Sequence, residues 1–169
     1  MAIQIAGQKA AEKYFNMTLY KVEDVSKVSS DGLSSARFAD KSFCYVDEEL
    51  CPITTERFNK VEEKMKHGVG IVVCKDNTYN MLRKNGMLVF ATGYDSIERV
   101  KDKKDVVRLT KKVVNGINIY NFASIETGEE IFNEWFERIS SFDSEGKARA
   151  VTARGKVCTI TTSGIVEMD

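Results

Sequence analysis

The chain has 169 residues, of which 43% are hydrophobic and 30% are charged, a balance typical of a globular protein rather than a disordered one. Its 25 basic residues equal its 25 acidic residues, so no net charge draws it to nucleic acid or to an anionic membrane surface. The longest apolar runs, 70–74 and 87–91, have the length of strands and are far shorter than the roughly 20 residues that span a bilayer. We therefore expect neither a nucleic-acid partner nor a membrane.

The first eight residues contain neither a basic lead nor a continuous apolar block, so we expect no secretory signal and a cytoplasmic location. Four cysteines, Cys44, Cys51, Cys74 and Cys158, include no Cys-x-x-Cys pair, and His67 is the only histidine. A zinc site normally takes two of its ligands from one tight turn. We therefore expect no metal ion or other cofactor, and reduced thiols that fill core positions.

Residues 1–31 differ from the rest of the chain. Residues 9–15 are rich in helix formers, whereas apolar residues alternate between positions 17 and 28, as they do in strands. A stacked array of repeats needs a dissimilar end that covers its first core face. We interpret residues 1–31 as an N-terminal α/β cap or docking segment.

From residue 32 to residue 169 the sequence repeats itself with a period of 36 to 42 residues. Three sets of residues recur in register: the aromatics Phe58, Tyr94 and Phe136, each with an aliphatic residue three positions later; the turn residues Leu50, Gly86, Gly128 and Gly164; and Phe43, Tyr79, Tyr120 and Val157, which each open a short strand. Such a period is typical of repeat architectures, in which the in-register aromatics form the core between units. We predict a β-repeat domain over residues 32–169, with units at about 32–67, 68–103, 104–145 and 146–169.

Each unit is interpreted as three strands joined by tight turns. Val, Ile, Tyr and Phe alternate in the predicted strands, and Asn85-Gly86 has the composition of a type I′ hairpin turn. The additional residues of the third unit fall at 113–117. Segments 55–67 and 130–139 have apolar residues at helical spacing, so a short helix is an alternative there, although we favour a turn or one helical turn. The predicted class is mostly β, and a twisted sheet, a solenoid and a barrel-like array all stay open.

The unit resembles the WG-containing repeat, also called the KWG repeat, in a degenerate form. The stretches that carry the resemblance are Thr78–Gly86 and Phe132–Ile139 leading into Phe142–Ala148, and the resemblance covers about residues 32–169. Proteins of this kind are found in bacteria and are frequent in bacteriophage genomes, often with no assigned activity. The resemblance implies no catalytic residues.

The motifs that could carry catalysis have simpler structural interpretations. His67 stands at a boundary between units, where an exposed connector is expected. The pair Gly68 and Gly70 precedes a strand, whereas a phosphate-binding loop precedes a helix. The acidic groups at 47–49 and 129–130 fall in predicted turns and are typical of turn solvation. We therefore predict that the protein is not an enzyme.

Aromatic residues outside the repeat register are candidates for an interaction surface, namely Trp135, Phe142 and Tyr20. Exposed tryptophan is a typical binding anchor, although Trp135 could equally close the core of the third unit. The first hypothesis is a non-enzymatic module that binds protein, either itself or another chain, and the family resemblance adds a phage-encoded origin to it. The second is a structural or accessory component of a phage virion or other large assembly, located in the host cytoplasm or the virion. An enzyme without a recognisable site is a third.

Overall fold

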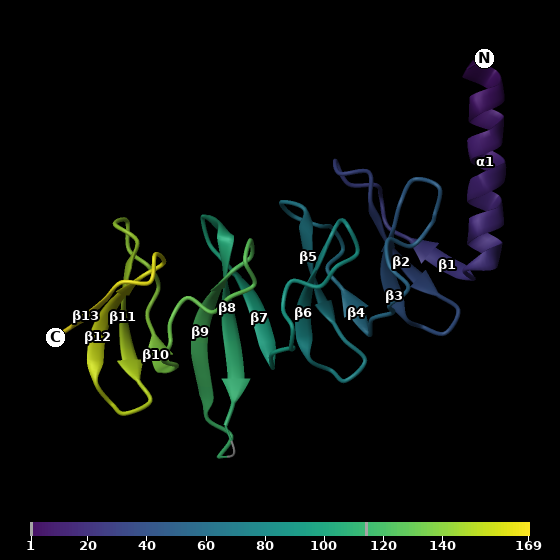
Figure 1. Ribbon diagram of the computed structural model, residues 1–169. Helices are drawn as coiled ribbons and strands as arrows, with labels where there is room; N and C mark the ends of the chain where they lie inside the picture. Colours follow the sequence, from purple (N-terminus) through teal and green to yellow (C-terminus); the bar gives the residue numbers. More distant parts are fainter. Residues whose placement is uncertain (1, 114) are drawn as a thin grey trace. The chain divides into compact units, whose positions relative to one another are not determined.

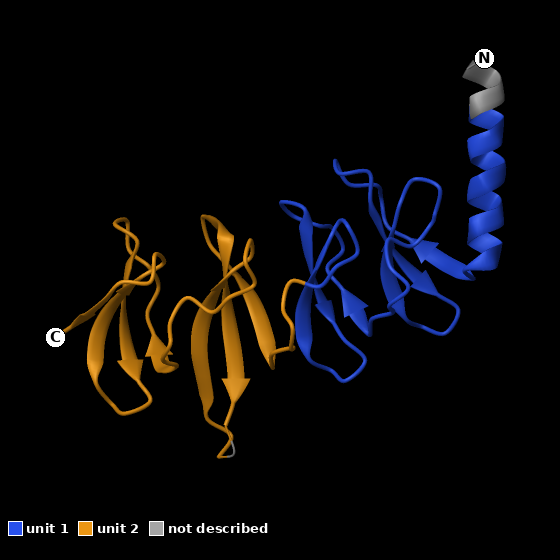
Figure 2. Ribbon diagram, viewed as in Figure 1, with its two compact units in different colours: residues 1–88 blue, residues 89–169 orange. Residues whose placement is uncertain are grey.

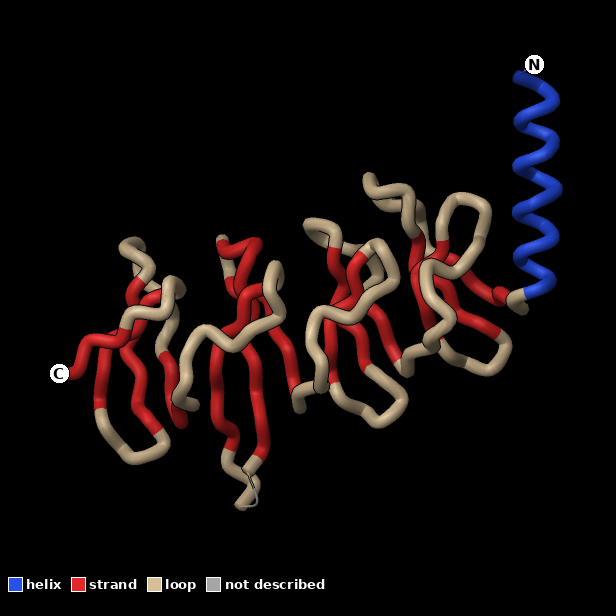
Figure 3. Tube along the Cα trace, in the orientation of Figure 1, coloured by secondary structure: helices blue, strands red, loops and turns tan. Residues whose placement is uncertain are grey.

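The computed structural model describes residues 2–113 and 115–169, with side chains from Ala6 onward. One helix is followed by β-structure (Figures 1 and 3). In the described residues the elements are α1 (Ala2–Leu19), β1 (Val22–Val25), β2 (Ser34–Phe38), β3 (Phe43–Val46), β4 (Lys60–Val61), β5 (Val69–Val73), β6 (Tyr79–Arg83), β7 (Ser96–Val100), β8 (Lys103–Lys112), β9 (Asn118–Ser124), β10 (Phe136–Ile139), β11 (Lys147–Thr152), β12 (Val157–Thr161) and β13 (Val166–Met168). The predicted mostly β class with an N-terminal helix is confirmed.

The structure divides into two compact units, residues 1–88 and residues 89–169 (Figure 2). The first unit contains α1 and two antiparallel sheets of order β1-β2-β3 and β4-β5-β6. The second contains one antiparallel sheet whose strands follow sequence order from β7 to β13. Among the described residues, no helix has both the length and the apolar character needed to cross a membrane.

Each unit buries its own apolar cluster. In β2, Ser34, Ala36 and Phe38 are buried in alternation with more exposed neighbours, because successive side chains of a strand point to opposite faces. The core of the first unit consists of Val22, Leu33, Ala36, Phe38, Cys44, Tyr45, Val46, Leu50, Phe58, Val61, Met65, Val72 and Leu82. A core cluster of the second unit consists of Phe122, Phe132, Phe136, Ala148, Ala150, Cys158 and Ile160.

The four turn residues predicted in register occupy equivalent turns. Leu50, Gly86, Gly128 and Gly164 all have positive φ, at 61°, 81°, 73° and 91°. Each donates its N–H to a carbonyl three or four residues earlier, namely those of Asp47, Arg83, Ser124 and Thr161, at 2.9 to 3.1 Å. Glycine adopts this left-handed conformation without the steric cost of a Cβ, which explains why three of the four turn positions are glycine.

The type I′ turn predicted at Asn85-Gly86 is wrong. Only Gly86 has positive φ there, and the Arg83 N–H reaches the Met87 carbonyl at 2.9 Å, so the turn is longer than the two-residue loop of a type I′ hairpin. Two successive positive φ values occur instead at His67 and Gly68, with φ of 54° and 78°. Reciprocal bonds between Lys66 and Val69 close that turn at 2.9 and 3.2 Å.

Close backbone packing gives two of the turn glycines a second role. A Cβ on Gly86 would overlap the Ile53 carbonyl oxygen, and a Cβ on Gly128 would overlap the Val89 carbonyl oxygen. In each pair the carbonyl belongs to the segment that follows the third strand of the preceding copy. The in-register glycines therefore both turn the chain and allow one copy to contact the next.

The three in-register aromatics are buried in similar places. Phe58, Tyr94 and Phe136 are 1%, 7% and 1% exposed. Each stands at or just before a strand that pairs with the following strand in sequence: β4 with β5, β7 with β8 and β10 with β11. Phe58 bridges to Phe43, and Phe136 pairs with Tyr120, the residues predicted to open strands. Phe58 and Phe136 therefore connect the third strand of one copy to the first strand of the next.

The turn, or single helical turn, that we favoured for the aromatic segments is wrong, and so is the short helix. Phe58 exchanges two backbone bonds with Phe43 at 2.8 and 2.9 Å, and the Asn59 N–H donates to the Val73 carbonyl at 2.8 Å. Pairing with strands on both sides overrides the helical spacing. Conversely, the segments after the in-register glycines Gly86 and Gly128, where the three-stranded unit places its third strand, contribute only isolated bridges, Leu82 with Leu88 and Ala123 with Glu130.

The loop expected at 113–117 joins β8 to β9. The Val113 N–H donates to the Ile117 carbonyl at 3.0 Å, and the Gly116 N–H donates to the Val113 carbonyl at 2.8 Å. Val114, which belongs to this predicted insertion, lies outside the described residues. Because β8 has 10 residues, the hairpin that it forms with β9 is longer than the other hairpins.

Candidate functional site

Trp135 belongs to a cluster of four side chains from successive parts of the second unit. Tyr94 and Trp135 stand just before β7 and β10, Lys111 lies in β8, and Glu130 follows β9. Pairing of β7 with β8 places Ser96 opposite Thr110, and pairing of β10 with β9 places Phe136 opposite Tyr120. These registers bring residues separated by up to 41 positions into contact. We call this set the Trp135 cluster.

The Glu130 carboxylate is at the centre of the Trp135 cluster. It accepts hydrogen bonds from the Tyr94 hydroxyl at 3.2 Å, from Trp135 Nε1 at 3.1 Å and from Asn121 Nδ2 at 3.4 Å. Lys111 Nζ is 3.5 Å from Glu130 Oε1. One carboxylate therefore positions two aromatic rings and lies beside an ammonium group.

The Lys111 ammonium lies over both rings. It is 4.3 Å from the Trp135 ring centroid and 5.3 Å from that of Tyr94, both within the roughly 6 Å at which a ring attracts a cation. The two centroids are 6.2 Å apart, with the rings tilted by 33°. The Lys111 and Glu130 side chains are 44% and 32% exposed, so solvent reaches the charged end of the cluster.

Tyr94 has a strongly shifted pKa. Burial is the main cause, and the charge of Glu130 and the hydrogen bond to it add to the effect, so that the pKa is raised from 10.0 to about 12. The phenol is thus held as a neutral hydrogen-bond donor. It positions Glu130 and is unsuited to act as a base near neutral pH.

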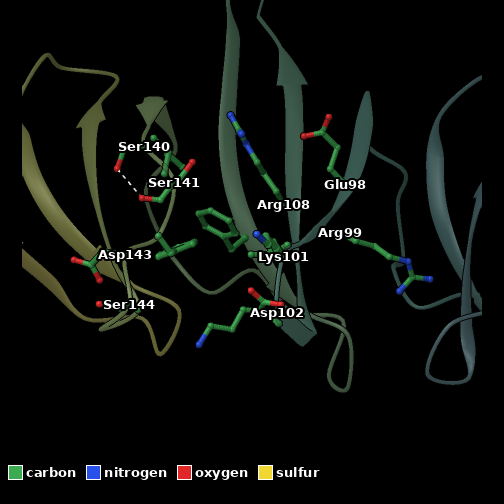
Figure 4. Close-up of a pocket in the computed structure, with 15 residues that line it drawn as sticks. Glu98, Arg99, Lys101, Asp102, Arg108, Ser140, Ser141, Asp143 and Ser144 are labelled. Carbon is green, nitrogen blue, oxygen red and sulfur yellow. Dashed lines mark hydrogen bonds between the residues drawn. The ribbon is translucent and has the colours of Figure 1, made fainter.

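Phe142 packs inside the second unit beside a pocket. Its ring centroid is 5.2 Å from that of Phe122. The pocket has a volume of about 580 Å³ and is lined by residues of β7, β8 and β9, the β7–β8 turn and segment 139–146. Figure 4 shows Ser140, Ser141, Asp143 and Ser144 on one side, and Glu98 and Arg108 on the other. Both acidic and basic residues line it, so its lining carries no single charge.

Arg108 is a half-buried cation that lines this pocket. Its guanidinium carbon lies 4.1 Å from the centroid of the Tyr120 ring. Its Nε is buried and has no hydrogen-bond partner among the described residues. The Asp143 carboxylate accepts the Glu145 and Lys147 N–H groups, each at 2.9 Å, so it stabilises its own turn rather than Arg108.

Tyr20 lies in the first unit, half-buried against the core. The Cys51 thiol donates to its hydroxyl at 4.0 Å, a contact that raises the pKa of Tyr20. Trp135 and Phe142 have different ring partners, Tyr94 and Phe122. That these three residues contact a partner stays a prediction.

An exposed apolar surface that we did not predict lies on α1. Tyr14, Phe15, Met17 and Leu19 are 75%, 62%, 42% and 55% exposed, and we call these four residues the α1 surface. The sequence signal is the apolar cluster at the end of a helix-prone segment, which we interpreted as part of a cap or docking segment.

The motifs weighed for catalysis have structural roles. His67 is exposed in its tight turn. Gly70 lies against the Tyr45 ring, where a Cβ would overlap the Tyr45 hydroxyl. Asp47 accepts the N–H groups of Glu49 and Cys51 at 3.0 and 2.9 Å and so stabilises a turn. Within the described part of the chain, no three His, Cys, Asp or Glu side chains lie close enough to hold a metal ion.

No protein-family model matches the chain, and no curated protein sequence matches it. Similar solved structures include the computationally designed Ika4 protein, with 13% identity and a TM-score of 0.40, Kluyveromyces lactis Hsv2p, with 17% and 0.41, and the WD40 domain from Toxoplasma gondii coronin, with 11% and 0.42. The matches cover 83%, 83% and 87% of this chain. They cover 90% of the designed protein, but only 49% and 44% of the other two chains.

Proposed function

We propose that the protein is a non-enzymatic β-repeat module that binds another protein through the α1 surface. The observation that supports this proposal most strongly is the exposure of Tyr14 and Phe15, at 75% and 62%, at consecutive positions of one helix. Large exposed apolar side chains that cluster, rather than occur singly, mark interaction sites. In this proposal the module is built from the repeat unit that resembles the WG-containing repeat.

The attachment of α1 supports the same proposal. Figure 1 shows the helix standing clear of β1, β2 and β3 except near its C-terminal end. Asn16 is the buried residue among the side chains of α1 that the structure describes, from Ala6 onward, and Asn16 Nδ2 donates to the Glu49 carbonyl at 3.0 Å. Lys9, two turns earlier on the same face, is 3.7 Å from the Glu49 carboxylate. This polar attachment leaves the apolar side chains of the α1 surface on the open side.

Helix energetics also favour a partner. An isolated helix of this length is only marginally stable in water, and most helical stability in proteins comes from packing an apolar face. The α1 surface carries such a face without a neighbour among the residues described in the first unit. A groove that accepts Tyr14, Phe15 and Leu19 would supply that packing.

The double variant Tyr14→Glu/Phe15→Glu tests this proposal. Affinity isolation from the native source should recover a protein partner with the wild-type chain and lose it with the variant. Met87→Glu is the matched control, because Met87 is 65% exposed in the same unit but lies outside α1. Equal recovery with the wild-type chain and the double variant, at unchanged melting temperatures, would contradict the proposal.

A structural role in a larger assembly is the second candidate, and β13 favours it. This strand forms one edge of its sheet, and Ile165, Val166 and Met168 are 53%, 44% and 57% exposed. An edge strand with apolar neighbours is a template for pairing with another chain. Val166→Lys should abolish concentration-dependent self-association in sedimentation velocity if copies pair at β13, and association that persists would argue against this edge.

A further inference from the structure

The Trp135 cluster has the composition of a site for an organic cation. Two aromatic faces and a carboxylate surround one ammonium group, with Lys111 Nζ 4.3 and 5.3 Å from the two ring centroids and 3.5 Å from Glu130 Oε1. Aromatic faces with a nearby carboxylate recognise ammonium ligands in many proteins. Here the ammonium comes from the chain itself.

The cage does not depend on Lys111 for its shape. Glu130 is held by hydrogen bonds from Tyr94, Trp135 and Asn121, and Tyr94 is also packed edge-on against Phe90, with centroids 5.3 Å apart. Removing the lysine therefore leaves rings and carboxylate in place. Such a site is organised before a ligand enters, which lowers the cost of binding.

Lys111 itself is held loosely. Its 3.5 Å contact with Glu130 is longer than the roughly 2.7 to 2.9 Å of a tight charge-assisted hydrogen bond. Its side chain is 44% exposed, and a lysine stem gains rotamer entropy when it is released to solvent. A competing ammonium group can therefore displace the Lys111 ammonium.

We propose that Tyr94, Trp135 and Glu130 form a binding site for an alkylammonium group, which Lys111 fills until a lysine side chain of a partner displaces it. That the ammonium group belongs to a lysine of a partner rests on the proposed protein-binding function. Recognition of an ammonium group by the site is independent of that function and can be tested with a small cation.

Trp135 is the only tryptophan of the chain, so its fluorescence reports on the cage directly. We would titrate n-butylammonium into the wild-type chain and into Lys111→Ala. Because a tethered competitor acts at about millimolar or higher effective concentration, its removal should raise the apparent affinity at least about tenfold. If Lys111→Ala lowers the melting temperature, Lys111→Thr, which suits a strand, replaces it.

Three controls make the result decisive. Lys112→Ala, which removes an adjacent exposed lysine, should behave as the wild type. Adding Glu130→Gln to Lys111→Ala should abolish the gain, and neutral n-butanol should give no saturable response. An affinity in Lys111→Ala no higher than in the wild type, or an equal response to n-butanol, would overturn the site whether or not the α1 surface binds a partner.

Discussion

Glu130 is the side chain on which the Trp135 cluster depends most. It accepts bonds from Tyr94 and Trp135 and faces Lys111. Glu130→Gln should lower the Tyr94 pKa from about 12 toward, but not to, its ordinary value of 10.0, because burial remains. A pH titration of tyrosinate absorbance measures this, with Tyr94→Phe identifying the step that belongs to Tyr94. A Tyr94 pKa that is the same in Glu130→Gln as in the wild type would contradict the contribution of Glu130 to the shift.

The same shift makes stability depend on pH. The native Tyr94 holds its proton up to about pH 12, whereas an unfolded tyrosine loses it near pH 10.0. The native state thus binds more protons than the unfolded state in this window. The contribution of Tyr94 to the free energy of unfolding is therefore fully present below pH 10.0 and is lost as the pH rises toward 12. Urea titrations should show a smaller decline in Tyr94→Phe than in the wild type.

The contact between Gly70 and the Tyr45 ring explains why residue 70 is a glycine. The sequence allowed us to reject a phosphate loop at Gly68 and Gly70, but not to identify why Gly70 is glycine. Tyr45 is buried, its hydroxyl donates to the Glu62 carbonyl at 2.7 Å, and its ring occupies the space where a Gly70 side chain would be. Tertiary contacts of this kind are absent from local sequence patterns.

Gly70→Ala should therefore destabilise the protein by about 1 to 3 kcal/mol through overpacking. Chemical denaturation measures the change, and Gly7→Ala, where a Cβ meets nothing within 4 Å, is the control. In a Tyr45→Leu background the additional cost of Gly70→Ala should shrink. An equal cost in both backgrounds would exclude the Tyr45 ring as its cause.

At the scale of elements, the turn glycines separate a conformational role from a packing role. Gly128 and Gly155 both have positive φ, at 73° and 78°, but only Gly128 has a carbonyl oxygen where its Cβ would lie. Alanine at either site should cost about 1 to 2 kcal/mol from the left-handed backbone. Gly128→Ala should cost about 1 to 3 kcal/mol more, and equal losses on urea denaturation would refute the packing role.

The attachment of α1 can be tested at Asn16. Asn16→Ala removes the bond to the Glu49 carbonyl, which contributes about 1 kcal/mol, and a marginal helix should then open locally. Hydrogen exchange should accelerate across residues 6–19 while β2 and β3 keep their protection, and Lys13→Ala should change neither. Equal acceleration in helix and strands would instead show that α1 unfolds only with the whole unit.

Strand assignment shows where local pattern reasoning succeeds and fails. The in-register turns were predictable because Gly86, Gly128 and Gly164 report a backbone conformation directly. The segments that begin at Phe58 and Phe136 were not, because their conformation is fixed by partners on both sides, such as Phe43 and Tyr120. A pairing between separate segments leaves no periodic signature within either of them.

At the scale of the molecule, the repeat predicted the β class and the similar burial of Phe58, Tyr94 and Phe136. The Trp135 cluster was only partly predictable: Trp135 was a candidate, but its contacts with Lys111 and Glu130 depend on strand pairing and carry no local sequence signal. The α1 surface was not identified, because residues 1–31 were interpreted as a cap or docking segment without Tyr14, Phe15, Met17 or Leu19 being named as exposed. Among the described side chains of α1 the buried one, Asn16, is polar, and Tyr14, Phe15, Met17 and Leu19 are exposed, which is the reverse of a simple cap.

Native mass measurement of the protein isolated from its source tests the central claim, that this repeat array exists to hold a protein. We predict a mass above the 19.0 kDa of one chain, with a partner in fixed ratio, and a return to the single-chain mass in Tyr14→Glu/Phe15→Glu. A wild-type preparation that contains only the 19.0 kDa chain would contradict the account.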